Sequence, residues 1–315
     1  MTRFDSNLES TMVREAVVHL GNIYAWHRRR LSLWFFLVGS VVVLLGLHVV
    51  RPDWALLPDF LNGHPGQALL AVFLGALLCE YVDSSLGMGY GTTLTPLLLI
   101  AGFEPLQIVP AVLFSEFLSG LAAGALHQRD GNVDLLRDPN ARRTALFLTL
   151  LSAGGAIAAA VIAISIPRFW FSLAIVTIVL AMGVVTLATL RRRIPYRPGN
   201  LIVVGLIAAF NKGLSGGGYG PLVTAGQVVS GMPAKNAVAI TSVAEAFTCL
   251  GGLGSYLALT GGLDWSLAVP LAAGALLSVP VATITVKRLP ETFIRGAVGV
   301  VTLMLGLISL AKLIG

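Results

Sequence analysis

The sequence predicts an all-α integral membrane protein built from two repeats of opposite orientation. Three observations lead to this fold class: a composition that cannot cover a water-facing surface, a series of long apolar segments, and two glycine-rich interruptions that align with one another. Of the 315 residues, 56% are hydrophobic and only 11% are charged, whereas a soluble domain has about 25% charged residues. This composition excludes a soluble enzyme, a disulfide scaffold and a disordered chain.

Seven continuous apolar segments have the length of a transmembrane helix, about 20 residues. The first, 31–50, follows a polar N-terminal region, and the others are 108–127, 144–166, 169–190, 236–259, 265–285 and 293–313. Two further stretches, 66–100 and 200–231, are apolar at both ends but interrupted at 83–91 and 212–220. Each half is predicted to be too short for a perpendicular crossing, so each stretch is predicted to form a broken helical hairpin.

The basic residues fix the orientation of these segments. Seventeen of the 21 lysines and arginines fall in the N-terminal region or in loops that the topology places on one side, which identifies the cytoplasmic side. Lys212 lies within the membrane, and Arg51, Arg168 and Lys312 fall on the other side. We therefore expect a multi-pass protein of the bacterial inner (plasma) membrane with a cytoplasmic N-terminus and an external C-terminus. Since no basic groove interleaved with aromatic residues is present, we expect no nucleic-acid partner.

The two interruptions align when the chain is shifted by 129 residues. Leu86-Gly87-Met88-Gly89-Tyr90-Gly91 then falls on Ser215-Gly216-Gly217-Gly218-Tyr219-Gly220. Without a gap, Gly102 falls on Gly231 and Glu116 on Glu245. Glycine alone is common in membrane helices, so the matching Tyr, Gly and Glu are what indicates an internal duplication.

The topology predicts that the two copies are inverted. The hairpin 66–100 starts on the external side and the hairpin 200–231 on the cytoplasmic side, and each is followed by three full spans. The predicted organisation is an N-terminal segment with the first transmembrane helix and an external loop (1–65), a first repeat (66–190), a cytoplasmic linker (191–199) and a second repeat (200–315). Inverted repeats with broken helices are typical of secondary transporters, which bind substrate near the midplane.

The chain resembles the TauE/SafE family of sulfite and organosulfonate exporters over residues 66–313. The resemblance rests on the paired glycine breaks, the turns at 102–105 and 231–233, and the small-residue helix with its glutamate after each turn. It implies export of sulfite, sulfoacetate or a related small anion by alternating access. The first copy departs from the glycine-only form, because Met88 stands where the second copy has Gly217.

Lys212 is the basic group predicted to lie at membrane depth. An anion could bind there, close to the glycines and the free N–H groups of a half-helix. An ion pair with Asp83, its counterpart under the shift, is the alternative, as is alternation between the two. The acids Glu80, Asp83, Glu116 and Glu245 are interpreted as coupling groups or structural groups, because a charge at the centre of a span costs about 2.5–3.5 kcal/mol unless it is paired or functional.

The predicted substrate-binding residues are those of the two interruptions. They are Ser84, Ser85, Gly87, Gly89, Tyr90, Gly91, Lys212, Ser215, Gly216, Gly217, Gly218, Tyr219 and Gly220. The two tyrosines could instead anchor the hairpin tips. We expect no catalytic residue, metal or cofactor, and the partners expected are a small anion and the lipid bilayer, with the oligomeric state open and a homodimer one option. The alternative functions are an anion channel, a proton-coupled carrier of another small carboxylate or sulfur anion, and a structural membrane subunit.

Overall fold

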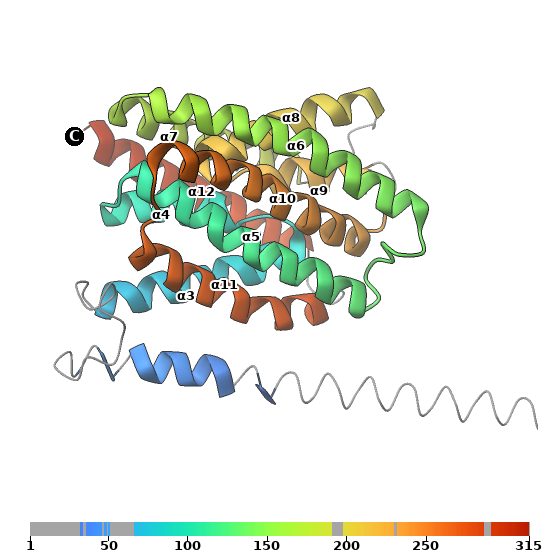
Figure 1. The fold of residues 1–315 in the computed structure, drawn as a ribbon, viewed down its shortest axis with the longest axis horizontal. Coiled ribbons are helices and arrows are strands. Elements are labelled where there is room, and N and C mark those ends of the chain that lie inside the picture. The colour runs from blue at the N-terminus through green and yellow to red at the C-terminus, as the bar shows by residue number, and fades with distance from the viewer. Residues whose placement is uncertain are drawn as a thin grey trace, which may run out of the picture.

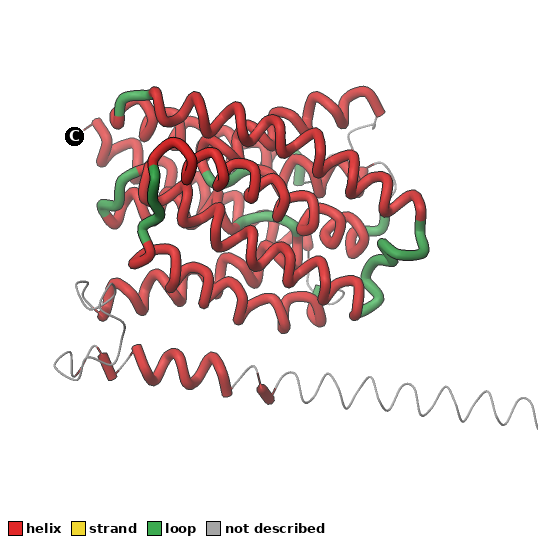
Figure 2. The backbone as a smooth tube through the Cα atoms, viewed as in Figure 1, coloured by secondary structure: helices red, strands yellow, loops and turns green. Residues whose placement is uncertain are grey.

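Helices joined by short loops make up the fold in a computed structural model of the chain (Figures 1 and 2). The structure describes residues 32–33, 36–45, 47–48, 50, 66–190, 198–229, 232–286 and 291–314, and it contains no strand among them. The labelled helices are α3 (Gly66–Leu86), α4 (Tyr90–Ala101), α5 (Pro105–Arg129), α6 (Pro139–Ser165), α7 (Arg168–Ala188), α8 (Pro198–Ser215), α9 (Tyr219–Val229), α10 (Ala234–Thr260), α11 (Trp265–Thr285) and α12 (Glu291–Ile314).

Seven helices in the described part of the chain are long and apolar enough to cross a membrane. They are α3, α5, α6, α7, α10, α11 and α12. The helix α4 is apolar but has only 12 residues, and α9 has 11, so neither crosses a 30 Å hydrocarbon layer alone. The all-α membrane class that the composition predicted is confirmed.

Short polar residues set the starts of several helices. The Asp138 carboxylate accepts a hydrogen bond from the Asn140 N–H at the start of α6, and the Asp264 carboxylate accepts one from the Ser266 N–H at the start of α11. Such N-caps satisfy backbone donors that have no partner within the helix. The loops before α6 and α11 therefore end at a residue whose side chain replaces a missing backbone bond.

The helices pack in pairs that are distant in sequence. The helix α3 lies along α11, and α8 lies along α6, on opposite sides of the bundle (Figure 1). Between them α5 packs against α10, and α7 packs against α12. The short helices α4 and α9 follow α3 and α8 directly, so both breaks lie inside the bundle rather than at its surface.

The prediction of the spans was largely right, and one part of it was wrong. The six continuous segments after the first all fall on α5, α6, α7, α10, α11 and α12. The stretch 66–86, however, is one helix of 21 residues, long enough to cross on its own. The polar residues 83–85 do not end it, because a polar side chain in a buried helix still leaves the backbone bonds intact.

The predicted first transmembrane helix, 31–50, lies only partly within the described residues. Its described core is the helix Phe36–Leu45. Leu45 is buried against Leu69 and Phe73 of α3, so this segment contacts the outer side of α3. Apart from residues 32–33, 47–48 and 50, the rest of the predicted N-terminal region (1–65) lies outside the described residues, as does most of the predicted linker (191–199).

Candidate functional site

Each break is a three-residue turn between two helices. The first consists of 87–89, between the end of α3 at Leu86 and the start of α4 at Tyr90, and the second of 216–218, between α8 and α9. Gly87 has φ 70° and Gly89 has φ 126°, while Gly216 and Gly218 have φ 73° and 82°. A residue with a Cβ atom is strained in this region. The glycines that align under the 129-residue shift are thus the ones that reverse the chain.

The two breaks cross each other with their backbones in contact. A Cβ atom added to Gly91 would collide with the Gly216 carbonyl, and one added to Gly220 would collide with the Gly87 carbonyl. A Cβ atom added to Gly217 would lie 2.5 Å from the Gly91 carbonyl carbon. These three glycines were predicted to let the backbone approach a substrate. In the structure they let the two breaks approach each other.

Two threonines join the breaks by reciprocal hydrogen bonds. The Thr95 hydroxyl on α4 donates to the Ser215 carbonyl oxygen at 3.0 Å, and the Thr224 hydroxyl on α9 donates to the Gly87 carbonyl oxygen at 3.1 Å. Thr95 and Thr224 are themselves 129 residues apart. Each short helix therefore satisfies a carbonyl at the end of the long helix of the other break.

Lys212 lies in the last turn of α8, beside the crossing. Its side chain is 1% exposed, and its ammonium forms ion pairs with the Glu116 carboxylate on α5 and, at 2.7 Å, with the Glu245 carboxylate on α10. The ion pair that the sequence suggested with Asp83 is therefore made with Glu116 and Glu245 instead. The two glutamates match under the repeat, so one ammonium lies between two equivalent acids.

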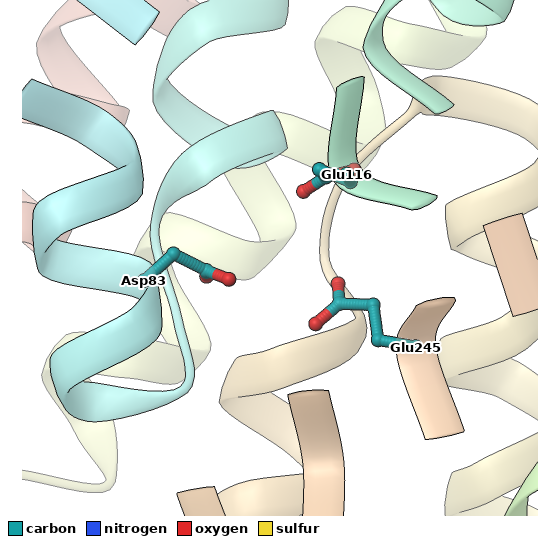
Figure 3. A group of neighbouring side chains, drawn as sticks. All are labelled: Asp83, Glu116 and Glu245. Atoms are coloured by element: carbon teal, nitrogen blue, oxygen red, sulfur yellow. The ribbon is translucent and has the colours of Figure 1, made fainter. Parts of the chain in front are cut away.

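Three acids lie around this lysine, and a fourth lies one helical turn away on α3. The carboxylate oxygens of Asp83, Glu116 and Glu245 lie within 4.8 Å of one another, and Figure 3 shows the three side chains converging from α3, α5 and α10. The fourth acid, Glu80, lies one helical turn before Asp83. Carboxylates this close could in principle coordinate a metal ion, but the Lys212 ammonium already contacts two of them and supplies positive charge there.

A small cavity opens between these acids. Its volume is about 10 Å³, the room of a single water molecule. The lining residues are Glu80, Asp83, Glu116, Ser119, Gly120, Ser242 and Glu245. The interior of the crossing is therefore polar, acidic and almost filled.

The comparisons with known proteins identify the family. The profile of the sulfite exporter TauE/SafE family matches residues 71–308. The chain belongs to the TauE/SafE family. It is 27% identical over 234 residues to the "Probable membrane transporter protein YtnM" of Bacillus subtilis (strain 168), an alignment that covers 70% of this chain and 75% of the relative. No solved structure matches the chain.

The family match, which begins in α3 and ends in α12, identifies this TauE/SafE chain as a multi-pass membrane transporter. Both breaks and all five buried charged residues at the crossing lie inside the matched region. The expectation from sequence that the chain is a TauE/SafE-like membrane transporter is confirmed.

The predicted serines bind protein groups at the crossing of this TauE/SafE chain. The Ser84 hydroxyl donates to Glu80 Oε1 at 2.6 Å, and the Ser85 hydroxyl donates to the Ala282 carbonyl oxygen at 3.5 Å. The Ser215 hydroxyl donates to the Asn211 carbonyl oxygen at 2.8 Å and accepts from the Gly217 N–H. Each of these hydroxyls thus has a partner within the protein.

The two predicted tyrosines occupy equivalent places at the starts of α4 and α9. The Tyr90 hydroxyl is 2.6 Å from the Ser115 hydroxyl of α5, and the Tyr219 hydroxyl is 2.8 Å from the Ser152 hydroxyl of α6. Both tyrosines are fully buried. These contacts are those of anchors that hold the starts of the short helices against neighbouring spans.

The sequence interpretation missed Thr95, Thr224 and Ser119. The two threonines join the breaks, and the Ser119 hydroxyl lines the acidic cavity. The 129-residue spacing of the threonines was a signal that could have found them. No comparable signal marks Ser119, which has Thr248 as its counterpart under the shift.

A larger hollow lies away from the crossing. It has a volume of about 390 Å³ and is open to the surface, between α4, α5, α7 and α12. Arg168 and Lys312 line it, but Arg168 is paired with Glu104 at 2.8 Å and the Lys312 ammonium donates to the Ile100 carbonyl oxygen at 2.7 Å. None of the predicted substrate-binding residues lines this hollow.

Proposed function

We propose that this chain is a secondary transporter that exports a small anion of the sulfite or organosulfonate class, with the anion bound at the crossing of the two breaks. The observation that carries the proposal is the position of Lys212. It is the one lysine or arginine that is fully buried among the residues the structure describes. A lone ammonium at the junction of broken helices is a binding group for an oxyanion. The outward direction and the class of anion rest on the family name.

Alternating access is the mechanism that fits two inverted repeats. In this mechanism each repeat packs its first long helix on the other repeat. The helix α3 of 66–190 packs on α11 of 200–315, and α8 of 200–315 packs on α6 of 66–190. Rocking of one repeat against the other would open the crossing to one side and then to the other. The reciprocal Thr95 and Thr224 bonds support an equivalent role for the two breaks.

The described arrangement corresponds to a closed crossing. The glycine backbones are in contact, and both carboxylate partners of Lys212 are in place. An anion therefore reaches the ammonium only when the breaks separate and at least one of Glu116 and Glu245 moves away or loses its charge. In this proposal the Lys212 ammonium binds a carboxylate when the crossing is closed and the transported anion when the crossing is open.

The test is efflux of anions from proteoliposomes that contain the full chain. Sulfite, sulfoacetate, taurine and formate are loaded in turn, and the variant Lys212→Met is compared with Lys312→Met, which removes an ammonium from the end of α12. We expect saturable, temperature-sensitive efflux of the sulfur oxyanions, lost at least tenfold in Lys212→Met and retained in the control.

Three results would contradict the proposal. Unchanged efflux in well-folded Lys212→Met would remove this lysine from the site. Single-channel currents in planar bilayers would indicate an anion channel. Absence of flux for every anion would reject this substrate class, and only the membership of a transporter family would remain.

A further inference from the structure

We propose that the acidic cavity at the crossing is a proton-binding site centred on Glu80, and that an anion binds Lys212 together with a proton taken up there. The proposal rests on the proposed function for its second half. Its first half, the proton site, stands on the charges, contacts and cavity of the described residues alone.

The charge balance of the cluster calls for protons. Glu80, Asp83, Glu116 and Glu245 are all at most 9% exposed, and Lys212 is the ammonium among them. Four carboxylates and one ammonium carry a formal charge of about −3 at membrane depth, where each unpaired charge is costly. A buried acid without a partner becomes neutral by binding a proton. At least one of the four acids is therefore protonated when the crossing is closed.

Several polar atoms that line the cavity have no hydrogen bond of normal geometry among the described residues. They are Glu80 Oε2, Glu116 Oε1 and the Ser119 hydroxyl oxygen, and Ser119 lies close enough to interact with the Glu80 carboxyl group. All three residues line the cavity, which holds about one water molecule. Buried polar atoms normally have partners, so these oxygens indicate a bound proton, with or without a water. A cation held by these carboxylates would also offset the negative charge, and a sodium requirement of the flux, tested below, distinguishes that case.

Of the four acids, Glu80 is the one whose surroundings most favour the protonated form. Its Oε1 accepts the Ser84 hydroxyl, and its Oε2 has Ser119 nearby but no hydrogen bond of normal geometry in the described part of the chain. Glu116 and Glu245 are paired with Lys212, and Asp83 Oδ1 accepts the Tyr90 N–H at 3.4 Å. Within the described ranges, Glu80 is thus the one acid of the four that has no positively charged or backbone partner to favour its charged form.

The titratable groups that face Glu80 come from four helices. They are Asp83 on α3, Glu116 on α5 and Glu245 on α10, which line the same cavity, and Lys212 on α8, which reaches the cluster through its ion pairs with the two glutamates. The neighbouring helix α11 (Trp265–Thr285) has no charged residue, and α4 presents Tyr90. Lys212 is the positive group of the set, so any negative ligand that arrives near Glu80 meets an excess of acids.

A polar path leads from Glu80 to one end of the bundle. Ser84, which donates to Glu80, has its own carbonyl oxygen 3.0 Å from His127 Nε2 near the end of α5. The Asn132 side-chain N–H donates to His127 Nδ1 at 2.8 Å, so Nε2 is the nitrogen that carries the hydrogen. Asn132 lies in the loop after α5. Polar groups therefore extend from the cavity toward this loop, but the Ser84 carbonyl oxygen only accepts a hydrogen bond and does not itself pass on a proton.

The binding of an anion and the binding of a proton are linked, because the anion competes with carboxylates for the Lys212 ammonium. An anion can bind the ammonium only if Glu116 or Glu245 releases it. The anion then adds a negative charge to the cluster, and the released carboxylate is left without its ammonium partner. Uptake of a proton by the cluster restores the balance, so each favours the binding of the other. For a monovalent anion, the transfer of anion and proton together moves no net charge.

The experiment uses methanesulfonate, which stays an anion at every pH tested. The full chain is reconstituted in proteoliposomes with a pH-sensitive dye inside, and the membrane potential is set with potassium and valinomycin. We expect efflux to raise the internal pH and to be insensitive to the potential. We also expect efflux to increase as the internal pH falls, by up to about tenfold per pH unit, the limit for one linked proton.

The variant Glu80→Gln, which keeps a neutral group in place of the protonated acid, is expected to lose the proton movement and most of the pH dependence of the efflux. Glu104→Gln, an acid at the start of α5 that is 50% exposed and paired with Arg168, is the matched control and should behave like the unchanged chain. Flux that moves no proton and has the same pH dependence in Glu80→Gln would overturn the linkage and leave the proposed function intact. Flux that requires sodium would overturn it too.

A second measurement does not depend on any anion. Infrared spectra of the full chain in lipid should show the carbonyl band of a buried protonated carboxyl group, and Glu80→Gln should remove it. If the band is present and no anion is transported, the proton site stands and the proposed function fails. Absence of the band in the unchanged chain would overturn the proton site itself.

Discussion

Lys212 is the residue on which the centre of the bundle depends, because one ammonium connects three helices. It reaches from α8 to Glu116 on α5 and to Glu245 on α10. Removal of one partner from a buried ion pair leaves a charge without compensation, which costs far more than loss of an exposed pair. The same residue is therefore structural when the crossing is closed and available to an anion when the crossing opens.

Because Lys212 stabilises the closed crossing, we predict that Lys212→Met strongly destabilises the folded protein. We expect a loss of about 3–5 kcal/mol in the free energy of unfolding, because two carboxylates lose their ammonium. The exposed pair of Arg168 and Glu104 is the control, and Arg168→Met should cost no more than about 1 kcal/mol. Thermal unfolding in detergent at several concentrations of denaturant measures both.

A second change should rescue that loss. Combining Lys212→Met with Glu116→Gln and Glu245→Gln removes the uncompensated charges, and we expect the triple variant to be more stable than Lys212→Met alone. The coupling energy of such a cycle isolates the interaction. If the triple variant is less stable than the single one, the ion pairs do not account for the effect of the lysine.

The glycines at the crossing make a second prediction at the residue scale. In Gly91→Ala and Gly220→Ala the new methyl group meets a backbone carbonyl of the other break, which cannot move aside as a side chain can. We expect each variant to lose about 1–3 kcal/mol or more. The controls are Gly154→Ala and Gly254→Ala, which have no atom within 4 Å of the new Cβ. Since Ala favours a helix over Gly, these should be neutral or stabilising.

The short helices α4 and α9 are each hydrogen-bonded to the opposite break as well as joined to their own. Thr95 on α4 and Thr224 on α9 each donate across the crossing. Neither helix is long enough to cross the membrane, so their position depends on such contacts and on the buried tyrosines at their starts. Opening of the crossing has to break these bonds.

Thr95→Val and Thr224→Val should therefore loosen the closed crossing. Each removes one donor and leaves a buried carbonyl unsatisfied, at a cost of about 1–3 kcal/mol. Hydrogen exchange of the amides in 87–91 and 216–220, followed by mass spectrometry, should become faster in both variants. Thr177→Val is the control, because that hydroxyl donates to the Leu173 carbonyl within its own helix. Faster exchange in Thr177→Val at the same peptides would show that the effect is general.

Sequence predicted the spans and the breaks because both depend on local composition. A span needs about 20 apolar residues, and a reversal inside the membrane needs glycines with positive φ. The end of α3 was placed too early because polarity at 83–85 was taken as a break, whereas the chain reverses only at Gly87. The partners of Lys212 could not be predicted in this way. The choice of carboxylate partner depends on how α5, α8 and α10 pack together. The local sequence around Lys212 does not predict that packing.

At the scale of the whole molecule, the contacts are consistent with two equivalent halves. The pairs α3 with α11 and α8 with α6 exchange under the 129-residue shift, and the pairs α5 with α10 and α7 with α12 map onto themselves. A transporter made of two such halves has its site where they meet. We proposed that the two halves are inserted in the membrane in opposite orientations. Two such halves can open the site first to one side of the membrane and then to the other.

Equivalent positions in the two halves should therefore face opposite sides of the membrane. Leu106 at the start of α5 and Lys235 at the start of α10 are such a pair, since they are 129 residues apart and neither is buried. In a background with Cys79→Ala and Cys249→Ala, a membrane-impermeant maleimide should label Leu106→Cys from the external side and Lys235→Cys from the cytoplasmic side. Everted vesicles should reverse the result. Labelling of both from one side would mean parallel halves, and a parallel arrangement cannot alternate access by the exchange of equivalent conformations.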